Sequence, residues 1–473
     1  MSRFDYDVMV IGGGGAGITA ALTANGLGKK VVMIEKNKLG GECTWSGCVP
    51  SKALIRAASM VNKIKNIEDF GIDMEGNYKI NSKNVMRYVQ SVIEKVYKEE
   101  KPEVFEGKGI HIIIGEASFI DQHHVVVKDK KISAQKIIIA TGTSPFIPPI
   151  PGIQEINYVT NETIFKIKEL PDSMIVIGGG AIGVELAQAL NRLGVEMTIL
   201  LRGDQILVKE EKELVDILTK KLIKEGIQLV TKAKIIGCEN EKDKVAIAIE
   251  KEGEKILITG DMVLVATGRK PNLTKLMLDR VGVKYSKKGI ITNSMMQTSV
   301  SHIFACGDIA GPYQFSHMAG YQGMIAGLNA CLPIKRKADY SNVLWCTFTD
   351  PELAHVGLTE KEAIEKYGDD IKVYRQEYKN LDRAKTDGTE EGMAKFICDR
   401  KGKILGAHIL GERAGELIHE GQLLKSLHLP IQKAQSIIHA YPTYSDLTKK
   451  IGQQVYIDRL ENNMIIKNLK KLF

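Results

Sequence analysis

Two cysteines lie close together near the start of the chain, in the stretch GECTWSGCVPSK from Gly41 to Lys52. Cys43 and Cys48 precede SKALIRAASMV, a segment predicted to be helical. Such a pair could be a structural disulfide, part of a metal site or a redox-active dithiol. A zinc site would want two more ligands at usable spacing, and none lies nearby in the sequence. A helix N-terminus stabilises a thiolate and lowers the ordinary cysteine pKa of ~8.5, which favours the redox interpretation.

The composition also bears on the choice between a structural disulfide, a metal site and a redox-active dithiol. A chain of 473 residues suggests domains of roughly 150 residues each. Its 65 basic and 57 acidic residues give a net charge of +8 without a long run of one sign, so we expect no nucleic-acid partner. No apolar run reaches the ~18 residues of a membrane span, and no signal peptide is recognised. We therefore expect a cytoplasmic protein, in which a structural disulfide would be unusual.

An internal repeat supplies the elements that must position the cysteines. Val10–Lys36 and Val176–Arg202 align without a gap, and each reads as a strand, the motif G-x-G-x-x-G, a helix and a second strand. The glycines permit a tight turn, a close approach to a pyrophosphate and close helix packing, with the helix N-terminus facing the phosphates. The sequence thus predicts two dinucleotide sites. Their glycines are Gly12, Gly14 and Gly17 in the first copy, and Gly178, Gly180 and Gly183 in the second.

The two copies differ where the nucleotide is identified. The first ends in Glu35, a carboxylate placed to accept hydrogen bonds from an unmodified adenosine ribose. The second has Leu201 followed by Arg202, and an arginine can meet a 2′-phosphate. We predict an adenine dinucleotide without the extra phosphate at the first site and NADPH at the second, with NADH as the alternative. An ordinary surface arginine on a loop is the other interpretation of Arg202.

Smaller features complete the predicted architecture. An Ala-Thr-Gly turn follows the strand KIII at 140–142, and another follows MVLV at 266–268. Alternating runs broken by Glu252-Gly253 predict a β-hairpin. From about Tyr340 the glycine pattern stops, and strands such as AKFICD and ILGAHIL follow. The predicted fold class is α/β, with two Rossmann-like dinucleotide-binding domains and a C-terminal α+β domain.

With two dinucleotide sites and a redox dithiol, the chain resembles the class I pyridine nucleotide–disulfide oxidoreductases over essentially its whole length. The resemblance rests on GGECTWSGCVPSK, the paired glycine motifs, both Ala-Thr-Gly turns, FACGD and the region from FTDPELAHVGLTE onward. It implies an FAD homodimer that passes electrons from NADPH through flavin to a Cys43–Cys48 disulfide. It also implies an FAD domain (1–150 and 271–339), an NAD(P)H domain (151–270, entered through a proline-rich linker) and a dimerisation domain (340–473).

The resemblance also implies residue roles. Cys43 is expected to be the thiol that meets the substrate, and Cys48 the thiol beside the flavin. Lys52 is expected near the flavin ring, paired with Glu185, since a nearby cation can stabilise reduced flavin. Asp308 is expected to hold the ribityl chain. The positions expected at the cofactors are Gly12, Gly14, Gly17, Glu35, Lys36, Gly41, Lys52, Ala140, Thr141, Gly142, Gly178, Gly180, Gly183, Arg202, Gly268, Gly307, Asp308, His317 and Ala319. We assign no resident metal site, and we expect the other cysteines to be small buried side chains.

The chain departs from the family near its C-terminus. Lipoamide dehydrogenase and glutathione reductase carry a histidine before the proline of HAYPTYSD and a glutamate where Asp446 stands. Here Tyr441 fills the histidine position, with His439 two residues earlier. A tyrosine with a pKa of ~10 is a poor base at neutral pH. Glu42, beside Cys43, could substitute as a base, although a solvated loop glutamate is the simpler interpretation.

The acceptor therefore stays open among several classes. Mercuric reductase-like members also lack the histidine and match best, but this chain has no cysteine after Cys398 to form their terminal cysteine pair. We expect a mercuric or other soft metal ion, or a disulfide, as acceptor. One rival interpretation is dihydrolipoamide dehydrogenase, and another is a partner-binding flavoprotein with residual diaphorase activity. The tail 461–473 is expected to pack on its own domain or to make a peripheral contact.

Overall fold

The structure is a computed structural model that describes residues 4–74, 76 and 78–463. The chain divides into two compact units. The first comprises Met1–Gly178, Leu193–Glu196 and Ala233–Asp339, and the second comprises Gly179–Arg192, Met197–Lys232 and Tyr340–Phe473. Each unit has its own buried apolar core, so each is described by itself.

The main sheet of the first unit has the strand order β3-β2-β1-β6-β5-β4, with β19 beside β6. The pairs β1–β2, β1–β6, β2–β3 and β6–β19 are parallel. Residues 8–11 of β1, residues 31–34 of β2 and all of β19 are buried apolar runs, as is typical of parallel strands covered on both faces. The strands are β1 (Tyr6–Ile11), β2 (Val31–Glu35), β3 (Ile110–Ile114), β4 (Ser118–Asp121), β5 (His124–Val127), β6 (Lys130–Ile139) and β19 (Ile303–Ala305).

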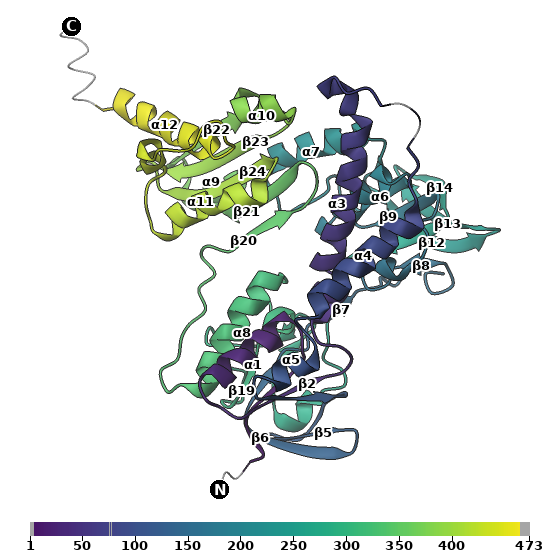
Figure 1. Cartoon of the computed structure of the whole chain (residues 1–473), viewed down its shortest axis with the longest axis vertical. Helices are drawn as coiled ribbons and strands as arrows, with labels where there is room; N and C mark the ends of the chain where they lie inside the picture. Colours follow the sequence, from purple (N-terminus) through teal and green to yellow (C-terminus); the bar gives the residue numbers. More distant parts are fainter. Residues whose placement is uncertain (1–3, 75, 77, 464–473) are drawn as a thin grey trace. The chain divides into compact units, whose positions relative to one another are not determined.

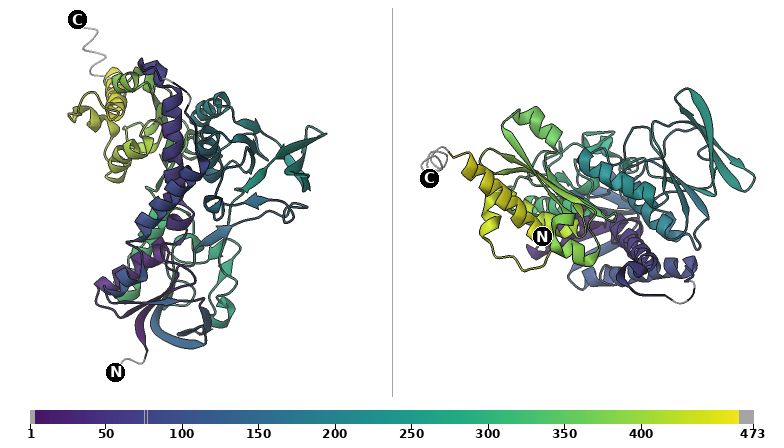
Figure 2. Two further views of the ribbon diagram at one scale, coloured as in Figure 1. Left: turned by 45° about the vertical axis from the view of Figure 1, so that its right-hand side comes forward. Right: turned by 90° about the horizontal axis from the view of Figure 1, so that it is seen from above.

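Two helices of this unit, α1 (Gly15–Gly26) and α8 (Ser316–Cys331), pack closely side by side (Figure 1). Glycines make the close packing feasible, because a Cβ at Gly323 would overlap the carbonyl oxygen of Ala16 and one at Gly327 would lie 2.9 Å from that of Ala20. The packing brings the start of α8 toward the start of α1. The cysteine stretch forms α2 (Gly41–Trp45) and the start of α3 (Cys48–Lys65), and α3 runs beside α4 (Ser82–Tyr97) (Figure 2).

The rest of the first unit carries shorter elements. Strands β13 and β14 are antiparallel around Glu252-Gly253, so the predicted hairpin is confirmed. Strand β7 pairs with β16, and β15 pairs with both β8 and β9 in parallel. The bounds are α5 (Pro102–Glu106), β7 (Thr143–Pro145), β8 (Tyr158–Val159), β9 (Ser173–Ile177), β12 (Lys234–Glu241), β13 (Lys244–Lys251), β14 (Glu254–Gly260), β15 (Met262–Val265), β16 (Arg269–Pro271), β17 (Tyr285–Ser286) and β18 (Gly289–Ile290).

The second unit contains an antiparallel sheet of order β20-β21-β24-β23-β22. The predicted strands AKFICD and ILGAHIL are β23 and β24 and pair with each other. The α/β fold class with a C-terminal α+β region is thereby confirmed. The bounds are α6 (Ala181–Arg192), β10 (Glu196–Leu200), α7 (Lys212–Lys224), β11 (Gln228–Val230), β20 (Leu344–Thr347), β21 (Glu352–Gly357), α9 (Glu360–Tyr367), β22 (Ile371–Glu377), α10 (Asp382–Asp387), β23 (Met393–Asp399), β24 (Ile404–Gly411), α11 (Ala414–Ser426) and α12 (Asp446–Glu461).

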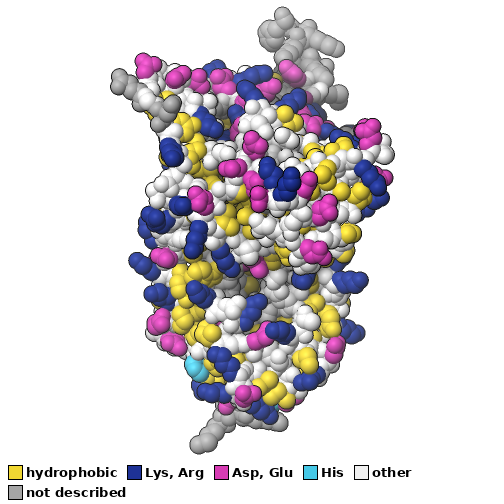
Figure 3. All heavy atoms as spheres, turned by 90° about the vertical axis from the view of Figure 1, so that its right-hand side faces the viewer, with side chains coloured by type: hydrophobic (Ala, Val, Ile, Leu, Met, Phe, Trp, Pro, Cys, Tyr) yellow, Lys and Arg dark blue, Asp and Glu magenta, His cyan; other side chains and the backbone are white. Residues whose placement is uncertain are grey.

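The surface carries both signs of charge. On the face drawn in Figure 3, basic and acidic side chains are interspersed. None of the described helices combines the length and apolar character that crossing a membrane requires. Most of the tail 461–473, whose packing the sequence left open, lies outside the described residues.

Candidate redox site

The first glycine turn leaves room for a ligand at the start of α1. Gly12 has a φ of 112°, and a Cβ on it would overlap Ala140, while a Cβ on Gly17 would overlap the carbonyl of Gly12. In contrast, a Cβ on Gly14 would meet nothing closer than 3.6 Å. The open space therefore lies at the N-terminus of α1, and a helix N-terminus is an environment that binds a phosphate.

The acidic residue at the end of β2 lies against this turn. Glu35 is buried, and its two carboxylate oxygens accept hydrogen bonds from the N–H groups of Gly13 and Asn37 at 2.7 and 2.8 Å. A carboxylate at this position can bind an adenosine ribose. The open turn and the carboxylate together fit an adenine dinucleotide such as FAD.

The stretch before the cysteines is bound to the same turn. The N–H of Gly40 donates to the carbonyl of Gly13 at 2.9 Å, and a Cβ on Gly41 would lie 2.6 Å from Gly14. Thr44 donates to Glu100 at 2.7 Å. Because α2 is held at both ends of this short segment, Cys43 lies beside the predicted dinucleotide site.

The structure brings the two cysteines together as thiols. Cys48 begins α3, and its Sγ lies 3.3 Å from the Oγ of Ser316, which begins α8. A hydrogen bond with Cys48 and burial raise the pKa of the Cys43 thiol. The prediction that a helix dipole lowers the pKa of these thiols is therefore wrong for Cys43, because its hydrogen bond to Cys48 keeps the proton on it. The arrangement makes Cys43 the protonated member of the pair.

A second group of predicted residues meets where α1 and α8 pack. Gly307 has a φ of 76°, and a Cβ on it would lie 2.8 Å from the Cβ of Ala16 and 3.6 Å from that of Ala319. Asp308 accepts a hydrogen bond from Thr143 at 3.0 Å, and burial raises the pKa of Asp308. His317 is exposed and stacks on Phe315. The FAD positions predicted in the first glycine motif and those predicted around Gly307 are thus close in space.

Glu42, the residue before Cys43, is held in an ion pair. Both of its oxygens accept hydrogen bonds from the guanidinium of Arg269, and Asn161 donates to one of them at 2.6 Å. Burial raises the pKa of Glu42 to about 7, and Arg269 opposes the shift. The interpretation of Glu42 as a solvated loop residue is wrong, since its side chain is only 28% exposed and is paired. Because Arg269 occupies both oxygens, Glu42 is an anchor of the thiol-bearing segment.

Sequence reasoning missed Arg269, Asn161 and Ser316. Arg269 directly follows the predicted cofactor residue Gly268, and Ser316 directly precedes the predicted His317. Nothing in the sequence around Asn161 indicates its contact with Glu42. For Arg269 and Ser316, the only local signal in the sequence was therefore their position next to a predicted site residue.

The second glycine turn repeats the geometry of the first with one change. Gly178 has a φ of 116°, and a Cβ on it would overlap the carbonyl region of Ala266, whereas one on Gly180 would meet nothing within 4 Å. Leu201, at the position equivalent to Glu35, is buried over Gly179, and Arg202 is exposed. The second turn therefore has an exposed arginine beside it where the first has a carboxylate.

Lys52 lies in the first unit and Glu185 in the second. Lys52 follows Cys48 by one helical turn on α3, so the two side chains share a face. Glu185 is buried on α6, where its carboxylate accepts the N–H of Phe348 at 2.8 Å. The expected approach of Lys52 to Glu185 remains a prediction.

Tyr441 is presented to solvent, whereas His439 is not. The Tyr441 side chain is 74% exposed, its hydroxyl donates to Asp382 at 2.9 Å, and this hydrogen bond raises the pKa of Tyr441. His439 is bound to Glu420 at 3.0 Å. Asp446 begins α12, 3.7 Å from Lys450. A tyrosine with a raised pKa cannot act as a base at neutral pH, which agrees with the expected weakness of this position.

The remaining cysteines show no comparable arrangement. Cys238, Cys306 and Cys398 are buried, as expected, while Cys331 and Cys346 are half-buried. Burial raises the pKa of Cys306 to about 12. Over the residues that the structure describes, no three His, Cys, Asp or Glu side chains gather as a metal site.

Comparison with known proteins gives one consistent family. The model for pyridine nucleotide-disulphide oxidoreductases matches residues 6–323, and that for their dimerisation domain matches residues 343–451. A mercuric reductase from Staphylococcus aureus is 36% identical over 93% of this chain and 81% of its own length. A dihydrolipoyl dehydrogenase from Bacillus subtilis (strain 168) is 35% identical over 96% of this chain and 98% of its own. The solved structure of the HOCl-induced flavoprotein disulfide reductase RclA from Escherichia coli has a TM-score of 0.86 at 26% identity, covering 95% of this chain and 99% of that one.

Proposed function

The chain belongs to the pyridine nucleotide-disulphide oxidoreductase family, and on that premise we propose that it passes electrons from NADPH to the Cys43–Cys48 pair and on to a soft metal ion or a disulfide. Bound FAD would supply the two-electron step between the nicotinamide and the cysteine disulfide. The observation that carries the proposal is the thiol pair itself, held between the starts of α3 and α8 with Cys48 on Ser316.

The two thiols have different roles. Cys43 holds its proton through the hydrogen bond to Cys48 and is half-buried on the short helix α2. Cys48 is exposed at the first position of α3, where the helix dipole favours a thiolate. We assign Cys48 to the flavin side and Cys43 to the acceptor. Tyr441 stands where a proton-shuttling histidine would serve a disulfide acceptor, and it lacks the basicity for that task.

The coenzyme is proposed from the second glycine turn. Arg202 is exposed next to that turn, and Leu201 leaves no carboxylate to repel a 2′-phosphate. We therefore propose NADPH rather than NADH as the electron donor. The match to the dimerisation domain supports a homodimer, and we propose that it works in the cytoplasm.

A metal acceptor has support from the relatives. Several curated relatives are mercuric reductases, and RclA has been solved as a Cu(II) complex. In this chain the acceptor would meet Cys43. A soft metal ion can accept electrons from a dithiol without the proton delivery that a released thiol needs, and so it tolerates Tyr441.

The test is an acceptor screen with purified protein. NADPH oxidation would be measured with mercuric ion, cupric ion, glutathione disulfide, lipoamide and a quinone, and each acceptor would be repeated with Cys43→Ser. The proposal expects turnover with a metal ion or a disulfide that Cys43→Ser abolishes. Turnover with the quinone alone, unaffected by Cys43→Ser, would contradict it.

Dihydrolipoamide dehydrogenase is the second candidate. The dihydrolipoyl dehydrogenase from Bacillus subtilis matches this chain over nearly its whole length, which favours it. The exposed Tyr441 and the engaged His439 argue against it. Rapid oxidation of dihydrolipoamide with NAD⁺ by the wild-type protein would select this candidate.

A further inference from the structure

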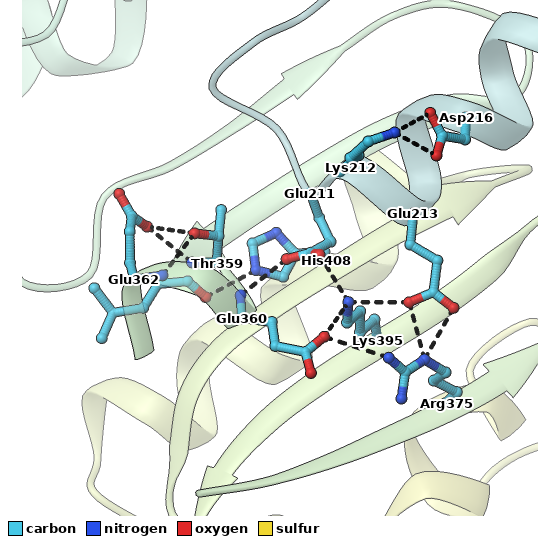
Figure 4. Close-up of polar contacts among 11 residues, drawn as sticks. Glu211, Lys212, Glu213, Asp216, Thr359, Glu360, Glu362, Arg375, Lys395 and His408 are labelled. Carbon is cyan, nitrogen blue, oxygen red and sulfur yellow. Dashed lines mark hydrogen bonds and ion pairs between the residues drawn. The ribbon is translucent and has the colours of Figure 1, made fainter. Parts of the chain in front are cut away.

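A buried lysine network lies in the second unit (Figure 4). Lys395, on β23, has a side chain only 2% exposed, and its Nζ contacts carboxylates of Glu211, Glu213 and Glu360 at 2.7, 3.0 and 2.6 Å. Glu211 and Glu213 stand at the start of α7, and Glu360 begins α9. A buried charge is stable in a protein only when it is paired. We call these four residues the Lys395 network.

Glu211 does more than neutralise Lys395. Its second oxygen accepts the N–H of Glu360 at 2.9 Å, so it bridges strand β23 and the first residue of α9. Arg375, on the neighbouring strand β22, pairs with Glu213 and Glu360 at 2.9 and 3.3 Å (Figure 4). Glu211 is thus bound through both of its oxygens, and Arg375 strengthens the network around Glu213 and Glu360.

The preceding residue, Glu210, is also buried against the C-terminal sheet. One of its oxygens accepts the indole N–H of Trp345 on β20 at 2.5 Å, and the other pairs with His355 on β21 at 3.1 Å. The rings of Trp345 and His355 stack with centroids 3.9 Å apart. Two consecutive carboxylates, Glu210 and Glu211, are therefore both committed to partners on the C-terminal sheet.

These carboxylates end the segment 201–211, which follows β10 and begins with Leu201-Arg202. The middle of the segment packs on the second glycine turn. The N–H of Leu207 donates to the carbonyl of Gly179 at 2.8 Å, and a Cβ on Gly179 would overlap Leu201 and lie 3.2 Å from Ile206. The segment is thus held by the glycine turn along its course and by the C-terminal sheet at its end.

We infer that Lys395, Glu210 and Glu211 are positioning residues for the coenzyme, holding segment 201–211 and the glycine turn under it in the shape that receives NADPH. The inference rests on the proposed function, which puts the 2′-phosphate at Arg202. A segment that is ordered before binding loses less conformational freedom when the ligand arrives. Loosening it should weaken coenzyme binding while leaving the rate at saturation nearly unchanged.

Glu211→Gln is the main test, because it preserves side-chain volume and removes the charge. We expect the Kd of NADP⁺ to rise about threefold to thirtyfold. The limiting rate of flavin reduction at saturating NADPH and the bound FAD content should stay within about twofold of wild type, because the change is expected to act on coenzyme binding alone. Lys395→Arg, which keeps the cation, should bind NADP⁺ more tightly than Lys395→Met.

Lys212→Gln is a matched control. Lys212 is the next residue of α7, and its ion pair with Asp216 at 2.8 Å is exposed, with side chains 69% and 50% accessible (Figure 4). The Kd of the Lys212→Gln variant for NADP⁺ should equal that of wild type. Because Lys395→Met takes the cation away from the buried Glu211 and can prevent folding, Trp345→Phe is the second test variant. It removes the hydrogen bond to Glu210, which keeps its pairing with His355.

Two outcomes would overturn the inference. One is that Glu211→Gln and Trp345→Phe bind the coenzyme as wild type does. The other is that they change only the limiting rate. Titrating wild type with both NADP⁺ and NAD⁺ separates this result from failure of the proposed function. If wild type prefers NAD⁺, the 2′-phosphate assignment is wrong, and the network is judged on the Kd of NAD⁺ in the same variants.

Discussion

Replacing Arg269 with methionine tests the anchor beside Cys43. In the wild-type protein Glu42 has a pKa of about 7 against an ordinary value of 4.5, so between those values the native state binds more protons than the unfolded chain. The contribution of Glu42 to the free energy of unfolding is therefore greatest below the unfolded-state pKa of 4.5. It is lost as the pH rises through the native-state pKa of about 7. For wild type this linkage removes about 1 kcal/mol of unfolding free energy between pH 6 and pH 8.

Arg269→Met removes the cation that holds the pKa of Glu42 down. Loss of the adjacent opposite charge would raise the pKa of Glu42 further above about 7. The native variant would keep the proton on Glu42 over more of this pH range, and the pH-linked loss would grow toward about 3 kcal/mol, the limit that one proton sets over two pH units. The variant should consequently be much closer to wild type at pH 6 than at pH 8.

The assay is urea unfolding followed by release of FAD fluorescence at pH 6, 7 and 8. The double variant Arg269→Met with Glu42→Gln has no titrating carboxyl and should lose the extra pH dependence. Lys275→Met is the matched control, because its ion pair with Glu116 at 2.8 Å is exposed, and it should shift stability by no more than about 1 kcal/mol at any pH. A destabilisation by Arg269→Met that is equal at pH 6 and pH 8 would refute the anchor and its linkage.

Three further predictions concern the proposed relay. Cys43→Ser should show a long-wavelength thiolate–flavin band in the oxidised enzyme, since Cys48 can no longer pair; a variant that lacks the band at all pH values would argue against Cys48 as the flavin-side thiol. Leu201→Glu with Arg202→Ala should reverse a wild-type preference for NADPH in kcat/KM, and a wild type that prefers NADH would disprove that assignment. Tyr441→His should raise lipoamide turnover by up to about 10²-fold while leaving flavin reduction nearly unchanged, and robust lipoamide activity in wild type would contradict the reasoning.

Local spacing in the sequence was sufficient for the glycine turns and the thiol pair. The turn at Gly12 and the strand that ends in Glu35 lie within one short segment of the sequence. The glycine at position 12 indicates a backbone conformation that only glycine adopts without strain. The hairpin around Glu252-Gly253 was predictable for the same reason. These features depend on neighbours in the chain, which a single sequence displays directly.

The contacts that complete the site join distant parts of the chain. Arg269 meets Glu42 across 227 residues of sequence, and Ser316 meets Cys48 across 268. No local sequence pattern indicates which distant side chain will contact such a position in the folded chain. The pKa of Cys43 was predicted in the wrong direction for the same reason, because the helix-dipole argument ignored the hydrogen bond with Cys48 and the burial that the folded chain imposes.

The central claim is that electrons from NADPH reach the Cys43–Cys48 disulfide. The most direct measurement is the number of titratable thiols in FAD-loaded protein, oxidised and desalted, before and after anaerobic addition of one equivalent of NADPH. Wild type should gain two thiols per chain, and Cys43→Ser should gain none. Consumption of NADPH with no new thiol in the wild-type protein would contradict the claim.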